Sequence, residues 1–245
     1  MQVLWFFVSP YSVRKAGTSM YHNEVSQYPK LFIAGDSTAA SYSSKDFPMV
    51  GWGQVINYFL KGVCVINLAQ CGRSSKSFID EGWFRLVEER IGQGDYFLIQ
   101  FGHNDEKSED PTRYTTADDT FPAYLKRYVD LAKSRGAHPV LITPVARRKF
   151  ENGVTVNTHG AYPEAVRELA DREEIPCIDL SVLGQQLMDQ LGEEGSKVLF
   201  VKTAPGDYPG YPEGHDDNTH FCQDGALIIA SLVAKEMKKA FPGKF

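Results

Sequence analysis

The chain has 245 residues, of which 42% are hydrophobic and 23% are charged, and its formal net charge at pH 7 is −5. This length and composition suit one globular domain and leave no basic block for nucleic acid, so we expect no nucleic-acid partner. The longest uncharged apolar stretch near the C-terminus, residues 226–234, is too short to cross a bilayer, and we expect no membrane partner.

The first thirty residues precede the first predicted strand and contain one short apolar run. A secretory signal would need Lys or Arg before its apolar stretch and small residues at a cleavage site. No Lys or Arg precedes the short apolar run at residues 3–8. We therefore expect residues 1–30 to be an extension packed on the body and residues 31–245 to be a single domain. The expected location is cytoplasmic, with secretion as the alternative.

From residue 31 onward, apolar runs alternate with segments whose apolar residues repeat at helical spacing. Continuous apolar runs suit strands that are buried on both faces. Alternating strands and helices predict an α/β fold, with a parallel sheet covered by helices. The predicted elements, in chain order, are a strand at 31–35, a helix at 52–61, a strand at 63–68, a helix at 83–91, a strand at 96–101, a loop at 105–120, a helix at 121–135, a strand at 139–143, a helix at 163–174, a strand at 177–180, and helices at 182–191 and 224–241.

A polar residue or a glycine follows each of the first three predicted strands. Ser37 comes after the first strand in Gly-Asp-Ser-Thr, Gly72 after the second, and Asn104 after the third in Gly-His-Asn-Asp. Ligands of open α/β sheets bind beyond the carboxyl ends of the strands. The spacing therefore predicts that these three residues meet at one edge of the sheet.

Ser37 has the partners that a hydroxyl nucleophile needs, namely a base for its proton and a carboxylate that holds the base. Asp217 and His220 lie just before the last predicted helix, and their separation suits a turn or helix start that points both side chains the same way. We predict that Ser37 is the nucleophile, His220 the base and Asp217 the carboxylate. The N–H of Ser37, if its turn opens into a helix, the N–H of Gly72 and the amide of Asn104 would form the oxyanion hole.

Neighbouring residues have competing interpretations. Asp36 is expected to cap the turn after the first strand. His103 is expected to line the pocket or brace Asn104. Asp216 is a rival of Asp217 on the residues alone.

Two more histidines and several arginines and tyrosines lie near the predicted site. His159 and His215 are candidate bases for which a solvated loop position is the expectation. An Arg can hold the carboxylate of an acidic sugar, and a Tyr can stack on a sugar ring, although exposed solubilising charges and a rigid loop explain the same residues. The candidate substrate contacts are Arg73, His103, Arg147, Arg148, Tyr208 and Tyr211.

The four cysteines include no CxxC pair, so metal-ligand spacing is absent and we predict neither a metal nor a cofactor. Cys64 and Cys177 lie in apolar runs and are expected to be buried thiols. Cys71 and Cys222 each lie within two residues of a predicted site residue. Free thiols are expected there, and a disulfide between them is the alternative.

Four segments taken together resemble the signature blocks of the SGNH, or GDSL-type, hydrolases. The blocks are Gly-Asp-Ser at 35–37, the glycine of 72–75, Gly-His-Asn-Asp at 102–105 and Asp-x-x-His at 217–220. Thr38, Gly-Trp-Gly-Gln at 51–54 and the stretch 72–78 resemble the rhamnogalacturonan acetylesterase branch, which removes acetyl groups from pectin. The resemblance implies a three-layer α/β/α, flavodoxin-like fold with a central parallel sheet of about five strands, and no metal.

The activity that the resemblance implies is that of a serine esterase removing O-acetyl groups from a carbohydrate. The expected partner is an acetylated oligosaccharide, most simply one derived from rhamnogalacturonan. One alternative is an esterase, lipase or thioesterase for another acyl substrate, such as acetylated xylan. A second is glycoside hydrolysis by Asp36 and Asp217, and a third is a sugar-binding protein without catalysis.

Overall fold

A parallel five-stranded sheet forms the centre of the computed structural model, which describes residues 28–245. The prediction that residues 1–30 pack on the body falls almost wholly outside the described residues. The sheet order is β2-β1-β3-β4-β7, which is the flavodoxin-like order, so the predicted fold class is confirmed. The strands are β1 (Lys30–Gly35), β2 (Cys64–Asn67), β3 (Tyr96–Gln100), β4 (His138–Ile142) and β7 (Cys177–Ile178).

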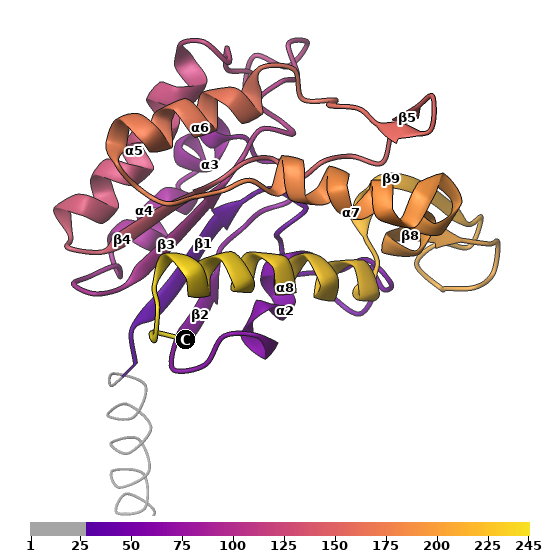
Figure 1. Cartoon of the computed structure of the whole chain (residues 1–245), viewed down its shortest axis with the longest axis horizontal. Coiled ribbons are helices and arrows are strands. Elements are labelled where there is room, and N and C mark those ends of the chain that lie inside the picture. The colour runs from indigo at the N-terminus through magenta and orange to yellow at the C-terminus, as the bar shows by residue number, and fades with distance from the viewer. Residues whose placement is uncertain (1–27) are drawn as a thin grey trace, which may run out of the picture.

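Helices cover both faces of this sheet and make three layers (Figure 1). Successive strand residues point to opposite faces, so Leu31 and Ile33 of β1 join one core while Phe32 and Ala34 join the other. The first core packs against α2 (Trp52–Val55), α7 (Leu180–Gly195) and α8 (Gln223–Ala240), and the second against α3 (Ser75–Asp80), α4 (Trp83–Glu88), α5 (Thr120–Ser134) and α6 (Tyr162–Glu173).

Most predicted helices match the observed ones within a few residues, but the helix expected at 52–61 is shorter. It ends at Val55, whose backbone leaves the helical region (φ −117°, ψ 0°), and continues as the 3₁₀ turn η1 (Ile56–Tyr58). The predicted loop at 105–120 has no helix or strand before α5 begins.

Several short elements were absent from the sequence prediction. The hairpin of β5 (Phe150–Glu151) and β6 (Val154–Thr155) turns at Asn152 and Gly153, both with positive φ. An Asn-Gly pair favours this turn, so the signal was present. The others are helix α3, the 3₁₀ turn η2 (Ser196–Leu199), and a second hairpin made of β8 (Phe200–Thr203) and β9 (His215–Phe221).

All four cysteines are free, so Cys71 and Cys222 form no disulfide. Cys64 and Cys177 are half-buried, so the expectation of fully buried thiols was wrong. Within residues 28–245, no helix has both the length and the apolar character to cross a membrane.

The core predicts a large cost for truncating Leu98, which lies in β3 at the middle of the sheet and is fully buried. We expect Leu98→Ala to lower the free energy of unfolding by about 2–5 kcal/mol, through lost burial and the cavity left behind. Leu191→Ala, at a partly exposed position of α7, is the matched control and should cost under about 1 kcal/mol. Urea unfolding monitored by circular dichroism measures both, and equal losses would contradict the core assignment.

Candidate active site

The structure brings the side chains of Ser37, His220 and Asp217 together, although 183 positions separate the first two. Ser37 lies in the turn after β1, and the other two lie on β9. His220 Nε2 is 2.9 Å from Ser37 Oγ, and His220 Nδ1 is 2.7 Å from Asp217 Oδ2. A ring that donates from Nδ1 to Asp217 leaves Nε2 to accept the hydroxyl proton of Ser37. The arrangement therefore suits nucleophilic catalysis.

The local geometry at Asp217 includes the expected turn, because its side chain closes an Asx-turn within β9. The segment is a strand, in which Asp217 Oδ1 accepts hydrogen bonds from the backbone N–H of Thr219 and of His220, the latter at 2.9 Å. Burial raises the pKa of Asp217, but the hydrogen bonds and charge of His220 outweigh it and hold the pKa well below the ordinary value. The carboxylate therefore stays ionised beside the imidazole.

A break in the strand pattern separates the two candidate aspartates. Regular alternation would put Asp216 on the face of His220, but the register of β9 against β8 shifts between Lys202 and Phe200. Asp216 is exposed and paired with Lys202, so its side chain points away from the histidine. His215, on the same face as Asp217, has its Nε2 3.4 Å from Asp217 Oδ2 and stacks on Tyr211. The expectation of a solvated loop position for His215 was therefore wrong.

The two backbone donors predicted for the oxyanion hole have no partner. Within the described part of the chain, neither the N–H of Ser37 nor that of Gly72 donates a hydrogen bond. Gly72 has a φ of +76°, and an added Cβ would meet only one atom, Arg113 Nη1 at 3.9 Å. Backbone conformation, and not lack of space, therefore requires glycine here.

The turn that carries Ser37 does not open into a helix, although the N–H of Ser37 was expected to serve the oxyanion hole only if it did. The turn closes with a hydrogen bond from Ala39 N to the carbonyl of Asp36 at 3.2 Å, and the next helix begins only at Trp52. The N–H of Ser37 is thus presented by a tight turn. Asn104, the third predicted donor, gives one amide hydrogen to the carbonyl of Arg73 at 3.0 Å and keeps the second.

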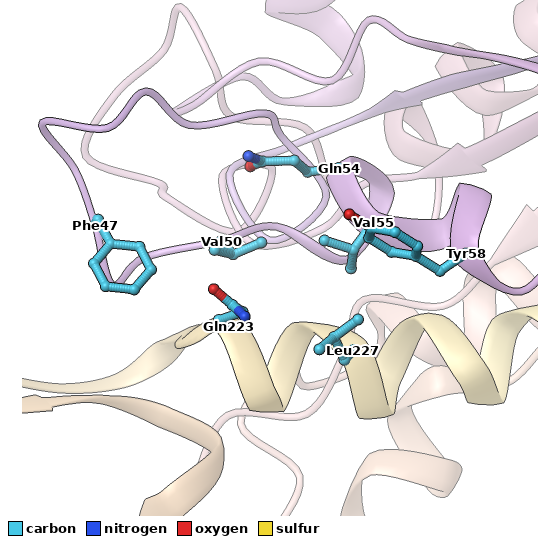
Figure 2. A pocket seen from close by; sticks show the side chains of 7 residues that line it. All are labelled: Phe47, Val50, Gln54, Val55, Tyr58, Gln223 and Leu227. Carbon is cyan, nitrogen blue, oxygen red and sulfur yellow. The ribbon is translucent and has the colours of Figure 1, made fainter.

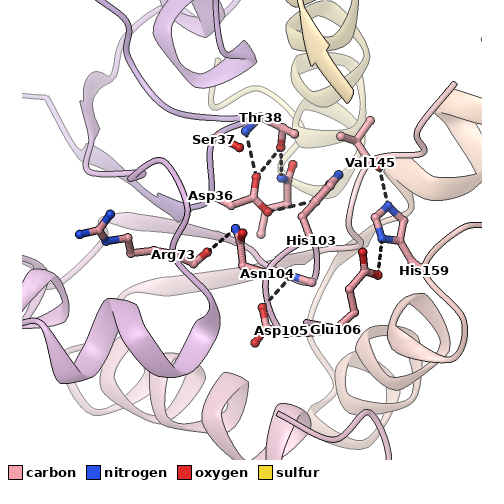
Figure 3. A network of polar contacts seen from close by, with 12 residues as sticks. Asp36, Ser37, Thr38, Arg73, His103, Asn104, Asp105, Glu106, Val145 and His159 are labelled. Carbon is pink, nitrogen blue, oxygen red and sulfur yellow. Dashed lines mark hydrogen bonds and ion pairs between the residues drawn. The ribbon is translucent and has the colours of Figure 1, made fainter. Parts of the chain in front are cut away.

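Asp36 is fully buried directly behind the nucleophile (Figure 3). Its Oδ1 accepts from the N–H and hydroxyl of Thr38 at 2.9 and 2.7 Å, which agrees with the expected capping role. Its Oδ2 lies 3.1 Å from Nδ1 of His103, which precedes Asn104. Burial raises the pKa of Asp36, while His103 and Thr38 lower it below the ordinary value. A side chain enclosed in this way is not available to a glycosidic bond, which argues against the glycosidase alternative.

His103 is buried and contacts Asp36, so the expectation that it lines a substrate pocket was wrong. Burial lowers the pKa of its imidazole to about 4, with the charge of Asp36 opposing the shift. The ring is therefore neutral near pH 7. It holds the loop that presents Asn104 against the turn that presents Ser37.

Side-chain contacts also hold the two residues after Asn104, which are Asp105 and Glu106. Asp105 accepts hydrogen bonds from the backbone of Ser75 and Gly102, each at 3.0 Å, and from the hydroxyl of Thr115; burial raises the pKa of Asp105 to about 7. Glu106 pairs with His159 at 3.0 Å and with Arg147.

His159 and Arg147 both contact Glu106. His159 is buried, with Nε2 3.0 Å from the carbonyl of Val145, so its expected solvated position was wrong. Arg147 pairs with Glu106, and this ion pair occupies the guanidinium that was expected to hold a substrate carboxylate. Both side chains therefore brace the loop after β3.

The remaining candidate contacts lie at the surface. Arg73 pairs with Glu81 at 2.6 Å, and Arg148 donates to Ser196 and to Asn218. Tyr208 meets Phe47 edge-on, with ring centroids 5.6 Å apart.

Two grooves share Phe47. The first, of about 470 Å³, lies between the segment 47–58 and the start of α8 (Figure 2). The second, of about 330 Å³, is lined by Phe47, by residues 208–210 and by Ser44 and Lys45. The lining of the first is Phe47, Val50, Gln54, Val55, Tyr58, Gln223 and Leu227.

Sequence reasoning missed part of the buried network. Trp52 Nε1 donates to Gln100 Oε1 at 2.7 Å, and Gln100 Nε2 donates to the hydroxyl of Thr38 at 2.6 Å. A Gln inside an otherwise apolar strand was the available signal, because a buried amide needs partners. Arg113, in the predicted loop, was also missed. Among residues 28–245, no cluster of three or more His, Cys, Asp or Glu is arranged to hold a metal ion.

Comparison with known proteins agrees with this geometry. Residues 33–225 match the model of the GDSL-like lipase/acylhydrolase family. A rhamnogalacturonan acetylesterase of Bacillus subtilis (strain 168) is 44% identical over 212 residues, which cover 86% of this chain and 90% of that protein. A probable rhamnogalacturonan acetylesterase of the same organism is 39% identical, covering 85% and 92%. Among solved structures, the YxiM protein of Bacillus subtilis superposes with a TM-score of 0.76 at 25% identity; the match covers 89% of this chain and 58% of that one.

The neutral state of His103 predicts a pH-dependent stability. The folded-state pKa of about 4 lies below the ordinary 6.5, so His103 contributes stability that is present above pH 6.5 and lost as the pH falls through 4. The slope from this group approaches about 1.4 kcal/mol per pH unit. Urea unfolding between pH 7 and pH 4 should therefore show a shallower decline for His103→Gln than for the wild type. The same substitution at the exposed His138 is the control, and identical slopes for His103→Gln and wild type would contradict the assignment.

Proposed function

Because the chain belongs to the GDSL-like lipase/acylhydrolase family, we propose that it is a carboxylic ester hydrolase that removes O-acetyl groups from rhamnogalacturonan-derived oligosaccharides. The observation that carries the proposal is the continuous contact from Ser37 through His220 to Asp217. The substrate is inferred from relatives, at 44% and 39% identity, named for acetyl removal from rhamnogalacturonan.

The proposed reaction has two stages. His220 Nε2 takes the hydroxyl proton as Ser37 Oγ attacks the acetyl carbonyl, and the N–H groups of Ser37 and Gly72 and the amide of Asn104 stabilise the oxyanion. The intermediate collapses when the C–O bond to the sugar breaks and His220 returns the proton to the sugar oxygen. Water, deprotonated by His220, then attacks the acetyl-enzyme, and acetate leaves as Ser37 recovers its proton. Asp217 stabilises the imidazolium in both stages.

The grooves around Phe47 are the proposed contact for the sugar chain. Val50 lines the first groove and donates its N–H to the carbonyl of Phe221 at 3.0 Å, so the groove wall adjoins the residue that follows His220. An aromatic ring offers an apolar face to the C–H face of a pyranose. Lys45, in the second groove, supplies a positive charge for a galacturonate carboxylate. Of the arginine candidates we keep Arg73, whose side chain is 37% exposed, and its guanidinium would exchange Glu81 for the substrate carboxylate.

A cytoplasmic location belongs to the same proposal. All four cysteines are free, including the exposed Cys71, which suits a reducing compartment. In that case the substrate is an imported oligosaccharide.

The esterase proposal predicts that Ser37→Ala abolishes acetate release. We expect turnover of an acetylated rhamnogalacturonan oligosaccharide to fall by about 10⁴-fold or more, because the acyl-enzyme cannot form. Acetate is measured enzymatically, and a fluorophosphonate probe should label the wild type and not the variant. Ser108→Ala, at an exposed position, is the matched control and should keep wild-type turnover.

The other activities give different results in the same assay. Faster turnover of long-chain than of acetyl esters would contradict the acetylesterase proposal, and faster turnover of acetylated xylan would change the sugar. Glycosidic cleavage that survives in Ser37→Ala would favour a glycoside hydrolase. Sugar binding without hydrolysis by the wild type would favour a binding protein.

The groove proposal predicts a change in KM that depends on the size of the substrate. Phe47→Ala should raise KM for the acetylated oligosaccharide by about tenfold, equivalent to about 1.4 kcal/mol of lost binding. Phe47 is 43% exposed, so its loss should leave the fold intact. KM and kcat for a small ester such as 4-nitrophenyl acetate should not change, since that ester does not reach the groove. Equal effects on both substrates would remove Phe47 from the sugar-binding surface.

A further inference from the structure

The amide of Asn104 can serve an oxyanion only if its nitrogen, and not its oxygen, faces the reacting carbonyl. A carboxamide has a donor end and an acceptor end of nearly the same shape, so neighbouring groups must select the orientation. The wrong orientation would place a partial negative charge against the developing anion. Whatever group holds the Asn104 oxygen is therefore important for catalysis.

Two contacts select the required orientation. Asn104 Nδ2 donates to the carbonyl of Arg73 at 3.0 Å, and Asn104 Oδ1 accepts from Nη1 of Arg113 at 3.4 Å. Rotating the amide by half a turn would set its oxygen against the Arg73 carbonyl and its hydrogens against the guanidinium. Both contacts of the rotated amide would be repulsive. The observed orientation is therefore the one that satisfies both neighbours.

The same guanidinium nitrogen reaches a second part of the oxyanion hole. Arg113 Nη1 lies 3.5 Å from the carbonyl oxygen of Gly72, whose N–H is unpartnered in the described residues. Gly72 follows β2 and Asn104 follows β3, and these strands are not neighbours in the sheet. Arg113 therefore connects two donors that the sheet itself does not join. Both contacts are long for hydrogen bonds, but the charge on the guanidinium strengthens them.

Arg113 is itself held in place. Its Nε donates to Asp110 Oδ2 at 2.6 Å, and Asp110 also accepts from the N–H of Thr112 at 3.0 Å. The end of this turn is tied to the oxyanion loop, because Thr115 N donates to the carbonyl of Asp105 at 3.0 Å. The side chain of Arg113 is 29% exposed, so it lies at the rim and not in the core.

We propose that Arg113 is a positioning residue, which fixes the amide orientation of Asn104 and holds it beside Gly72. This inference rests on the proposed acyl-transfer function, in which those two residues bind the oxyanion. Arg113 stabilises the transition state through Asn104 and does not bind the ground-state ester. Its loss therefore lowers kcat more than it raises KM.

The first experiment compares Arg113→Ala with the wild type on 4-nitrophenyl acetate. We expect kcat to fall by about 10- to 100-fold, somewhat less than for complete loss of an oxyanion donor, with KM changed by less than about threefold. Arg113→Lys keeps a positively charged donor whose side chain ends one bond short of Nη1, and it should recover part of the loss. Arg85→Ala removes an exposed arginine that pairs with Glu89 and is the matched control. Thermal melts of each variant show whether the fold is retained.

The second experiment tests whether Arg113 acts through Asn104. In the Asn104→Ala background the amide is absent, so adding Arg113→Ala should lower kcat by much less than it does alone. Added guanidinium ion should restore part of the activity of Arg113→Ala and none of that of Arg113→Ala/Asn104→Ala.

The results distinguish failure of this inference from failure of the proposed function. A kcat within about twofold of wild type in folded Arg113→Ala would overturn the inference and leave the esterase proposal intact. Fully multiplicative losses in the double variant would also overturn it, because Arg113 would then act independently of Asn104. A wild type that hydrolyses no acetyl ester would overturn the proposed function and this inference together.

Discussion

The buried carboxylate of Asp36 is the constraint on which the site depends. A carboxylate removed from water is costly unless charged or hydrogen-bonding partners surround it, so the chain has to bring Thr38 and His103 to it. Asp36 immediately precedes Ser37, the proposed nucleophile, and His103 immediately precedes Asn104, whose amide is the proposed oxyanion donor. Satisfying one anion therefore sets the distance between the attacking oxygen and the group that stabilises the resulting charge. Stability and catalytic geometry are linked through one side chain.

The site combines two structural sources of different kinds. The parallel sheet supplies the loops after β1, β2 and β3, which hold the nucleophile and the oxyanion donors at the point where the strand order reverses. The proposed base and its carboxylate come from β9, outside that sheet, in a hairpin whose strands pack through the rings of Phe200 and Phe221, with centroids 5.4 Å apart. Strand pairing within the sheet places these loops, whereas the hairpin is placed by side-chain packing and by isolated backbone hydrogen bonds, such as those from Val50 to Phe221 and from Arg148 to Asn218. The catalytic contact spans the boundary between these two parts.

The sequence predicted what local pattern and spacing control. Apolar runs identified all five sheet strands, and strand ends located Ser37, Gly72 and Asn104 at one edge. It did not predict β8 and β9, whose polar residues have no clear alternation and are ordered by contacts distant in sequence. His159 was misplaced because polarity suggested solvent, while its actual partner Glu106 is 53 positions away. His103 was expected to line the pocket or brace Asn104, and its partner Asp36, 67 positions away, could not be identified from the sequence. Arg113 had no signal, since its role depends on the position of two other loops.

The hydroxyl and the imidazole that meet at the centre of the site are 183 positions apart. Contacts of such separation close late, after the local helices and strands have formed. Turnover is therefore a stricter measure of renaturation than circular dichroism, since a compact chain whose β8–β9 hairpin has not docked would look nearly native by its backbone signal and yet be inactive. For this protein, recovery of turnover reports that the β8–β9 hairpin has docked against the turn after β1.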